Sequence, residues 1–135
     1  MAVISELIRV ESDGTISFGD YTLNEKAKLD NFAHNGGSYK VKTYMDITKL
    51  ECNDMFVYES VPGTAVSNFA KADDQVSFVV EGVEDAQITL ELEAESEYEV
   101  TINGESTGTV KTNLGGKLSF SVNLENAASV VIKKK

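Results

Sequence analysis

The sequence is poor in several residue types that particular functions need. It contains no tryptophan, one proline, one histidine, one cysteine and, in Arg9, one arginine. A single cysteine, Cys52, excludes an internal disulfide and a cage of thiolates around a metal ion. As a nucleophile Cys52 would need a nearby base, and His34 falls in a predicted turn, so we interpret Cys52 as a small half-buried residue. The sequence therefore predicts no catalytic residue, no metal site and no cofactor.

Long apolar segments are also missing. No stretch approaches the ~20 apolar residues that span a bilayer. The N-terminal segment carries Glu6, Arg9 and Glu11 where a signal peptide would have an uninterrupted apolar run. We therefore expect a cytoplasmic protein that does not act at a membrane.

Positive charge is scarce and unevenly placed. The formal net charge is −10, from 12 basic and 22 acidic residues, which disfavours nucleic acid and anionic lipid as partners. Residues 51–110 hold fourteen acidic residues and only Lys71. The lysines of the preceding segment are Lys26, Lys28, Lys40, Lys42 and Lys49. This distribution predicts two surfaces of opposite sign on one molecule.

What the chain does contain is a strand pattern. Apolar side chains recur at every second position in segments such as 76–81, 88–93 and 97–102, and turn residues follow at short intervals. We predict an all-β fold of about ten strands, an antiparallel β-sandwich of immunoglobulin-like or jelly-roll-like type with little or no helix. Residues 1–8 and 46–52 also fit short helices.

The chain length predicts a single domain, residues 1–135, because a chain of this size buries roughly 68% of its surface around one core. Pro62 and Gly63 form a strong turn signal. They mark a possible seam near residues 61–64 between an N-terminal and a C-terminal β half.

The alternation of apolar and polar side chains predicts the register of the first hairpin. A three-residue loop ending at Gly14 pairs Val10 with Ile16 and Ile8 with Phe18, so that the apolar residues of both strands share one face. Asn103 followed by glycine is a further hairpin signal.

The same argument from side-chain alternation applies to the glycine pair in KTNLGGKLSFSV, residues 111–122. A loop of residues 114–116 pairs Val110 with Phe120 and Thr112 with Leu118 on one face. Phosphate-binding glycine loops open a helix, whereas LSFSVNL has the pattern of a strand. We therefore interpret the glycines as turn residues.

A candidate binding surface lies in residues 26–44. A hairpin turning at residues 35–37 buries Ala27, Leu29, Tyr39 and Val41. The side chains predicted to lie together on the exposed face are Lys28, Lys40 and Lys42, beside Asp30 and the rings of Phe32 and Tyr44. Such a cluster suits an acidic glycan or an acidic protein surface. Alternatively, it is a solvated strand face whose lysines discourage edge pairing.

Acidic residues offer weaker candidates. Glu91 and Glu93, or Glu97 and Glu99, would lie about 7 Å apart on a strand, within the range of glycosidase carboxylates. No apolar surroundings are predicted that would raise the pKa of either pair, which disfavours catalysis. The acidic pairs at 73–74 and 84–85 are interpreted as solvated turns rather than calcium ligands.

The segments FGDYTL (18–23), MFVYESVPGTAV (55–66), EDAQITLELE (84–93) and KTNLGGKLSFSV (111–122) together resemble a family of small uncharacterised bacterial proteins, some of which are labelled endosialidase. Residues 98–122 are similar to accessory β-sandwich domains of polysaccharide-degrading enzymes. Sialidases grip their substrate with three arginines, and this chain has Arg9 alone. It also lacks the tryptophan of the Asp-box turns that sialidases repeat. The resemblance therefore implies no catalytic residue.

These observations rank three functions. The first is a non-enzymatic β-sandwich that acts through protein contacts, with a protein partner or by self-association of its lysine-bearing and acidic surfaces. The alternative is a carbohydrate-binding module for acidic glycans, with Tyr21, Tyr44 and Tyr58 as candidate rings. A glycosidase comes third.

Overall fold

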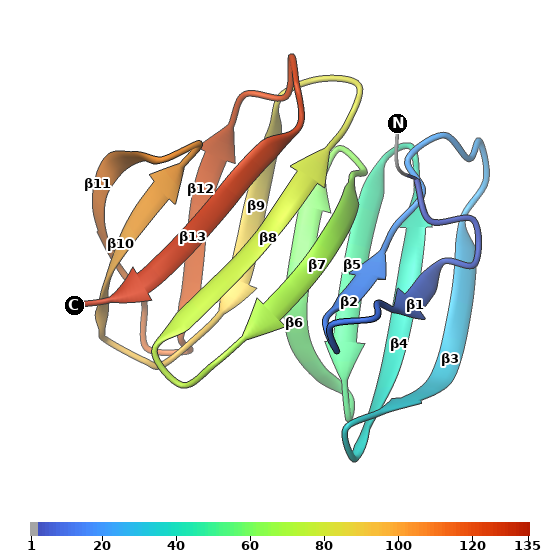
Figure 1. Cartoon of the computed structure of the whole chain (residues 1–135), viewed down its shortest axis with the longest axis horizontal. Helices are drawn as coiled ribbons and strands as arrows, with labels where there is room; N and C mark the ends of the chain where they lie inside the picture. The colour runs from blue at the N-terminus through green and yellow to red at the C-terminus, as the bar shows by residue number, and fades with distance from the viewer. Residues whose placement is uncertain (1–2) are drawn as a thin grey trace.

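The computed structural model describes residues 3–135, which form thirteen strands and no helix. Every strand pair is antiparallel, and the strands form two sheets. Sheet A has seven strands in the order β1-β2-β7-β8-β13-β10-β11, and sheet B has six in the order β12-β9-β6-β5-β4-β3. Figure 1 shows the two sheets as layers, with sheet A in front. The predicted all-β, sandwich-like fold is confirmed.

The strand bounds follow the chain. They are β1 Ile8–Val10, β2 Ile16–Phe18, β3 Ala27–His34, β4 Gly37–Tyr44, β5 Ile47–Cys52, β6 Met55–Val61, β7 Ala65–Lys71, β8 Gln75–Glu81, β9 Ala86–Glu91, β10 Glu97–Ile102, β11 Glu105–Lys111, β12 Lys117–Val122 and β13 Ala128–Lys134. Residues 46–52, which also fitted a helix, are therefore largely strand. Residues 3–8 are not helical either, and residues 1–2 lie outside the described part of the chain.

One hydrophobic core lies between the sheets and draws residues from both halves of the chain. Alternation works as predicted in β8, where Val76, Phe78 and Val80 are at most 3% exposed. Four rings meet at the centre in edge or stacked contacts with centroids 5.3–6.4 Å apart, namely Phe18, Tyr58, Phe69 and Phe78.

Two predicted hairpins are confirmed. Val10 lies opposite Ile16 and Ile8 opposite Phe18, with Gly14 at φ +87° in the left-handed region that the three-residue loop requires. Between β10 and β11, Asn103 and Gly104 form a two-residue turn in which both residues have positive φ. This is the turn type that matches the twist of paired strands.

The predicted hairpin across residues 114–116 is wrong. Val110 pairs with Tyr98 in sheet A, whereas Phe120 pairs with Ile88 in sheet B, so the loop carries the chain from one sheet to the other. The two strands point their apolar side chains into the same core from opposite sheets. The alternation of apolar and polar residues is the same whether two strands pair in one sheet or face each other across the core, so it does not distinguish the two. The glycines do serve the turn, since Gly116 has φ +81° and donates its N–H to the Asn113 carbonyl at 3.0 Å.

A second crossing, at residues 62–64, lies where the seam was predicted and joins β6 of sheet B to β7 of sheet A. It is held by buried hydroxyl groups. The Thr64 hydroxyl bonds to Tyr58 at 2.8 Å and to Ser60 at 2.7 Å. Gly63 is so close to β4 that a Cβ there would lie 2.0 Å from the Tyr44 carbonyl oxygen. The crossing is thus locked against the strands of sheet B.

Thr48 and Thr43 link this crossing to the loop between β2 and β3. The Thr48 hydroxyl donates to the Thr64 carbonyl at 2.8 Å and accepts the Thr64 N–H at 3.0 Å. Because that donation uses its only proton, the Thr43 hydroxyl, 2.8 Å away, must donate to Thr48. Thr43 in turn accepts the N–H of Asp20 at 2.9 Å. All three threonines are 0% exposed, so the network is dry.

We expect Thr48→Val to destabilise the protein by about 2–4 kcal/mol, because valine keeps the shape but removes the buried acceptor of the Thr43 hydroxyl proton and of the Thr64 N–H, and the donor to the Thr64 carbonyl. Urea unfolding measures the loss. Thr109→Val, at an exposed strand position, is the matched control and should change stability by less than about 0.5 kcal/mol. Equal losses in both variants would contradict a special role for the network.

Candidate functional site

The outer surface of sheet B carries a cluster of lysines from three adjacent strands. Lys28 on β3 lies directly opposite Lys42 on β4, which lies opposite Lys49 on β5. Lys40 occupies the neighbouring row, opposite Glu51. A shallow depression of about 250 Å³ is lined by these five side chains. We call the four lysines the lysine face; the structure brings Lys28, Lys40 and Lys42 together as predicted.

Most of this positive charge is uncompensated. Lys49 forms an ion pair with Glu51 at 3.9 Å. No ion pair joins Lys28, Lys40 or Lys42 to any residue of 3–135. Like charges directly opposite one another on paired strands destabilise a sheet. The row of three lysines is therefore unfavourable for folding.

An aromatic ring lies beside the lysine face. Phe56 on β6 has the ammonium groups of Lys49 and Lys117 at 5.8 Å and 4.5 Å from its centroid. Both distances allow cation–π attraction. Sequence reasoning missed Lys49 because residues 46–52 fitted either a helix or a strand; the alternation of Lys49 with Leu50 and Glu51 was the available signal. It missed Phe56 because the predicted binding surface ended at residue 44.

The two predicted rings are not part of the depression. Phe32 was expected beside the lysines, and that facing is wrong: two residues, Asp30 and Asn31, bulge opposite one residue of β4, and Asn31 takes φ +60°. The bulge turns Phe32 to the inner face, where it packs against the core. Tyr44 stands at the end of β4 with the Lys26 ammonium 6.0 Å from its ring centroid.

Of the two pairs of acidic candidates, Glu97 and Glu99 lie at alternate positions of β10, and Glu91 and Glu93 do not share a strand. β9 ends at Glu91, so Glu91 and Glu93 do not share a strand face as expected. Glu91 pairs with Lys117 at 3.3 Å, and Glu93 pairs with Lys134 at 2.5 Å. In residues 3–135 no three His, Cys, Asp or Glu side chains are grouped as metal ligands.

Cys52 and His34 line the same cleft. This cleft of about 360 Å³ opens between the ends of the two sheets, with Tyr39 beside Cys52 and Phe69 from the opposite sheet. The His34 Nε2 lies 3.1 Å from the Gly14 carbonyl oxygen and so joins two turns across the rim. Burial raises the pKa of Tyr39, and the neighbouring Cys52 raises it further. Sequence reasoning placed Cys52 and His34 separately, because the cleft forms only when the sheets stack.

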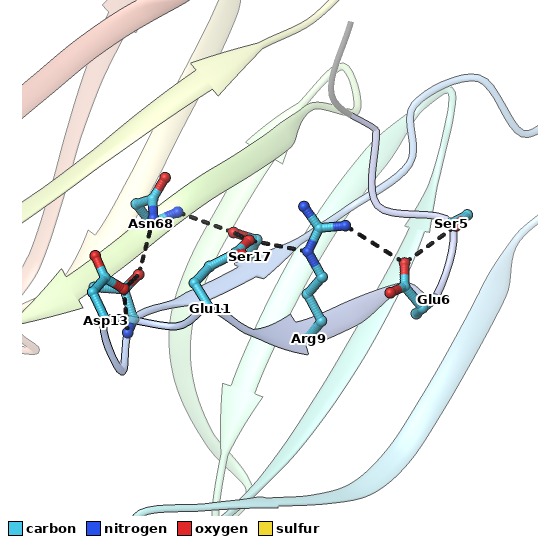
Figure 2. Close-up of polar contacts among 8 residues, drawn as sticks. Ser5, Glu6, Arg9, Glu11, Asp13, Ser17 and Asn68 are labelled. Carbon is cyan, nitrogen blue, oxygen red and sulfur yellow. Dashed lines mark hydrogen bonds and ion pairs between the residues drawn. The ribbon is translucent and has the colours of Figure 1, made fainter.

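The only arginine belongs to a polar network on sheet A (Figure 2). Arg9 donates to the Glu11 carboxylate at 3.0 Å, and the Ser17 hydroxyl donates to the same carboxylate oxygen. The N–H of Asn68 donates to Ser17 at 3.1 Å, which extends the network onto β7. Glu6 approaches Arg9 from the other side at 3.7 Å. Every member has a partner, so this network ties β1, β2 and β7 together.

Residues 3–135 include no helix with the length and apolarity needed to cross a membrane. Comparison of the chain with protein families, with curated proteins and with solved structures finds no match in any of the three.

The Glu11 network predicts acid sensitivity. Hydrogen bonds from Ser17 and Arg9 hold the pKa of Glu11 below its ordinary value of 4.5, despite burial and the nearby Asp13. A carboxyl whose pKa is lowered by folding adds stability above its unfolded pKa, and that stability disappears as pH falls through the folded value. We expect the wild type to lose more unfolding free energy than Glu11→Gln between neutral pH and about pH 3. Parallel losses in urea titrations would contradict this.

Proposed function

We propose that the protein is a non-enzymatic binding module whose lysine face docks onto an acidic protein surface. The observation that carries the proposal is the row Lys28–Lys42–Lys49, three like charges opposite one another on adjacent strands. The repulsion among these three lysines opposes folding. A negatively charged partner would offset the repulsion and contact several lysines at once.

Edge protection explains only part of the cluster. Lysines on exposed edge strands discourage unwanted pairing, and β3, which carries Lys28, is an edge of sheet B. Lys42 and Lys49 lie on β4 and β5, which have partners on both sides. Their position needs another reason, and an anionic partner supplies one.

The form of the surface favours a protein over a glycan. Modules that bind sugars place open aromatic rings against the sugar, and here Phe32 points inward while Phe56 is flanked by two ammonium groups. The depression is shallow and lined by charge, which suits carboxylates projecting from a protein surface. An acidic glycan remains the alternative because Tyr44 stands at the border of the face and residues 98–122 resemble accessory domains of polysaccharide-degrading enzymes.

Nothing in the proposal requires catalysis. Of the glutamates considered for glycoside cleavage, Glu91 and Glu93 pair with separate lysines. The cytoplasm stays the predicted location.

The direct test is binding of poly-L-glutamate, a chain that offers carboxylates and no sugar, measured by calorimetry at low salt. Lys42→Glu combined with Lys49→Glu should weaken binding by more than about tenfold. The matched control, Lys111→Glu with Lys133→Glu, makes the same charge change at exposed positions of sheet A and should bind as the wild type does. Equal weakening in both variants would place the effect in the net charge and overturn the site. Binding of polygalacturonate but not poly-L-glutamate would favour the glycan alternative.

Stability distinguishes loss of a contact from loss of the fold. Lys42→Glu puts a carboxylate between Lys28 and Lys49, so cross-strand repulsion becomes attraction. We expect the unfolding free energy to rise by about 0.2–1 kcal/mol per pair. A variant that is more stable in urea yet binds less tightly would separate function from folding, whereas a less stable Lys42→Glu would show that the lysine row does not repel.

A further inference from the structure

Four acidic residues lie at one end of the sandwich. The turns β8–β9, β10–β11 and β12–β13 meet at this end, at the upper left of Figure 1. Two adjoining depressions of about 420 Å³ and about 520 Å³ share Asn123 and Glu125. Glu84 and Asp85 line the first, and Glu105 lines the second. We call the four carboxylates Glu84, Asp85, Glu105 and Glu125 the acidic end.

The acidic end carries the exposed negative charge that a partner of the lysine face needs. All four carboxylates are exposed, and none forms an ion pair with a residue of 3–135. No lysine or arginine lines either depression. Val83 projects beside them with 72% of its surface exposed and adds an apolar contact. The acidic end and the lysine face are therefore complementary in charge.

We infer that the lysine face of one molecule receives the acidic end of a second copy of the same chain. The inference rests on the proposed function of the lysine face and names its partner. One molecule cannot make this contact with itself, because the lysine face covers the outside of β3–β5 while the acidic end lies on turns of other strands.

The geometry decides the kind of assembly. Two different surfaces meet, so the contact is heterologous, and after each addition the assembly as a whole still offers one free lysine face and one free acidic end. Such contacts build an open chain or a ring instead of a twofold dimer. The chain ends would be the only unpaired surfaces of the assembly.

The strength of this contact depends on ionic strength. Each copy carries a net charge of −10, which repels other copies at long range. At about 0.1 M salt the Debye length is about 10 Å, so long-range repulsion is screened while touching charges still attract. At about 1 M salt the Debye length falls to about 3 Å and the attraction weakens as well. Assembly should therefore be strong at the first concentration and lost at the second.

Light scattering after size exclusion tests the inference with two charge-reversed proteins. The face variant carries Lys42→Glu and Lys49→Glu, and the end variant carries Glu84→Lys and Glu125→Lys. The wild type should exceed the 14.7 kDa of one chain at about 0.1 M salt. Each variant alone should be a monomer, because the face variant presents two surfaces of net negative charge, while in the end variant two lysines cancel the charges of Asp85 and Glu105 and leave the lysine face without an acidic partner. An equimolar mixture should form a complex of two copies, since each variant supplies the surface that the other lacks and no further native surface is left free.

Asp73→Lys with Asp74→Lys is the matched control for the end variant. It makes the same charge change at the exposed β7–β8 turn and should assemble like the wild type. Loss of assembly in this control would overturn the placement at the acidic end.

Poly-L-glutamate binding separates the two proposals. A wild type that stays at 14.7 kDa but binds poly-L-glutamate through the lysine face would overturn self-association and leave the binding module standing. Failure of both measurements would overturn both proposals. Assembly of the mixture, with neither variant assembling alone, supports the inference.

Discussion

The architecture depends on the dry hydroxyl network around Thr48 and Thr64. Two sheets stacked through apolar contacts alone could slide, because such contacts have little directional preference. The network fixes the position of one sheet relative to the other at one point. The chain leaves sheet B after Val61 and enters sheet A after Thr64, and five hydroxyl groups meet at this crossing. Each hydroxyl is buried and has a partner, so any other arrangement would leave polar groups unpaired. The core then packs around a fixed crossing.

Much of the fold could be predicted because local rules govern it. The β1–β2 hairpin follows from the need to bring Val10 and Ile16 to one face, and the β10–β11 turn follows from Asn103 and a glycine. The partners of β11 and β12 could not be predicted in this way. Val110 faces the core from one sheet and Phe120 from the other, and their alternation is the same in either case. The buried threonines were also hidden, because an inward polar residue breaks the pattern on which sequence prediction depends.

The candidate site, like the fold, could be predicted only in part. Lys28, Lys40 and Lys42 could be placed together, because Leu29 and Val41 were assigned to one buried face and do lie opposite each other. Between this pair and the turn, the bulge at Asn31 changes the facing of Phe32. The dipeptide Asp-Asn does not by itself indicate a bulge rather than a continuing strand. Lys49 joins the site from a third strand, which a hairpin argument does not reach. Figure 1 shows why the acidic end escaped attention: its turns are far apart along the chain and meet only at one end of the sandwich.

The position of Lys42 between two other lysines has an evolutionary consequence. A substitution that removes its charge relieves repulsion, so random mutation filtered by stability alone would steadily erase the row. The buried threonines are different, since selection for folding is sufficient to keep them. Among descendants of this sequence, persistence of a basic residue at position 42 would thus record selection for an encounter with another molecule, and its decay would date the end of that selection.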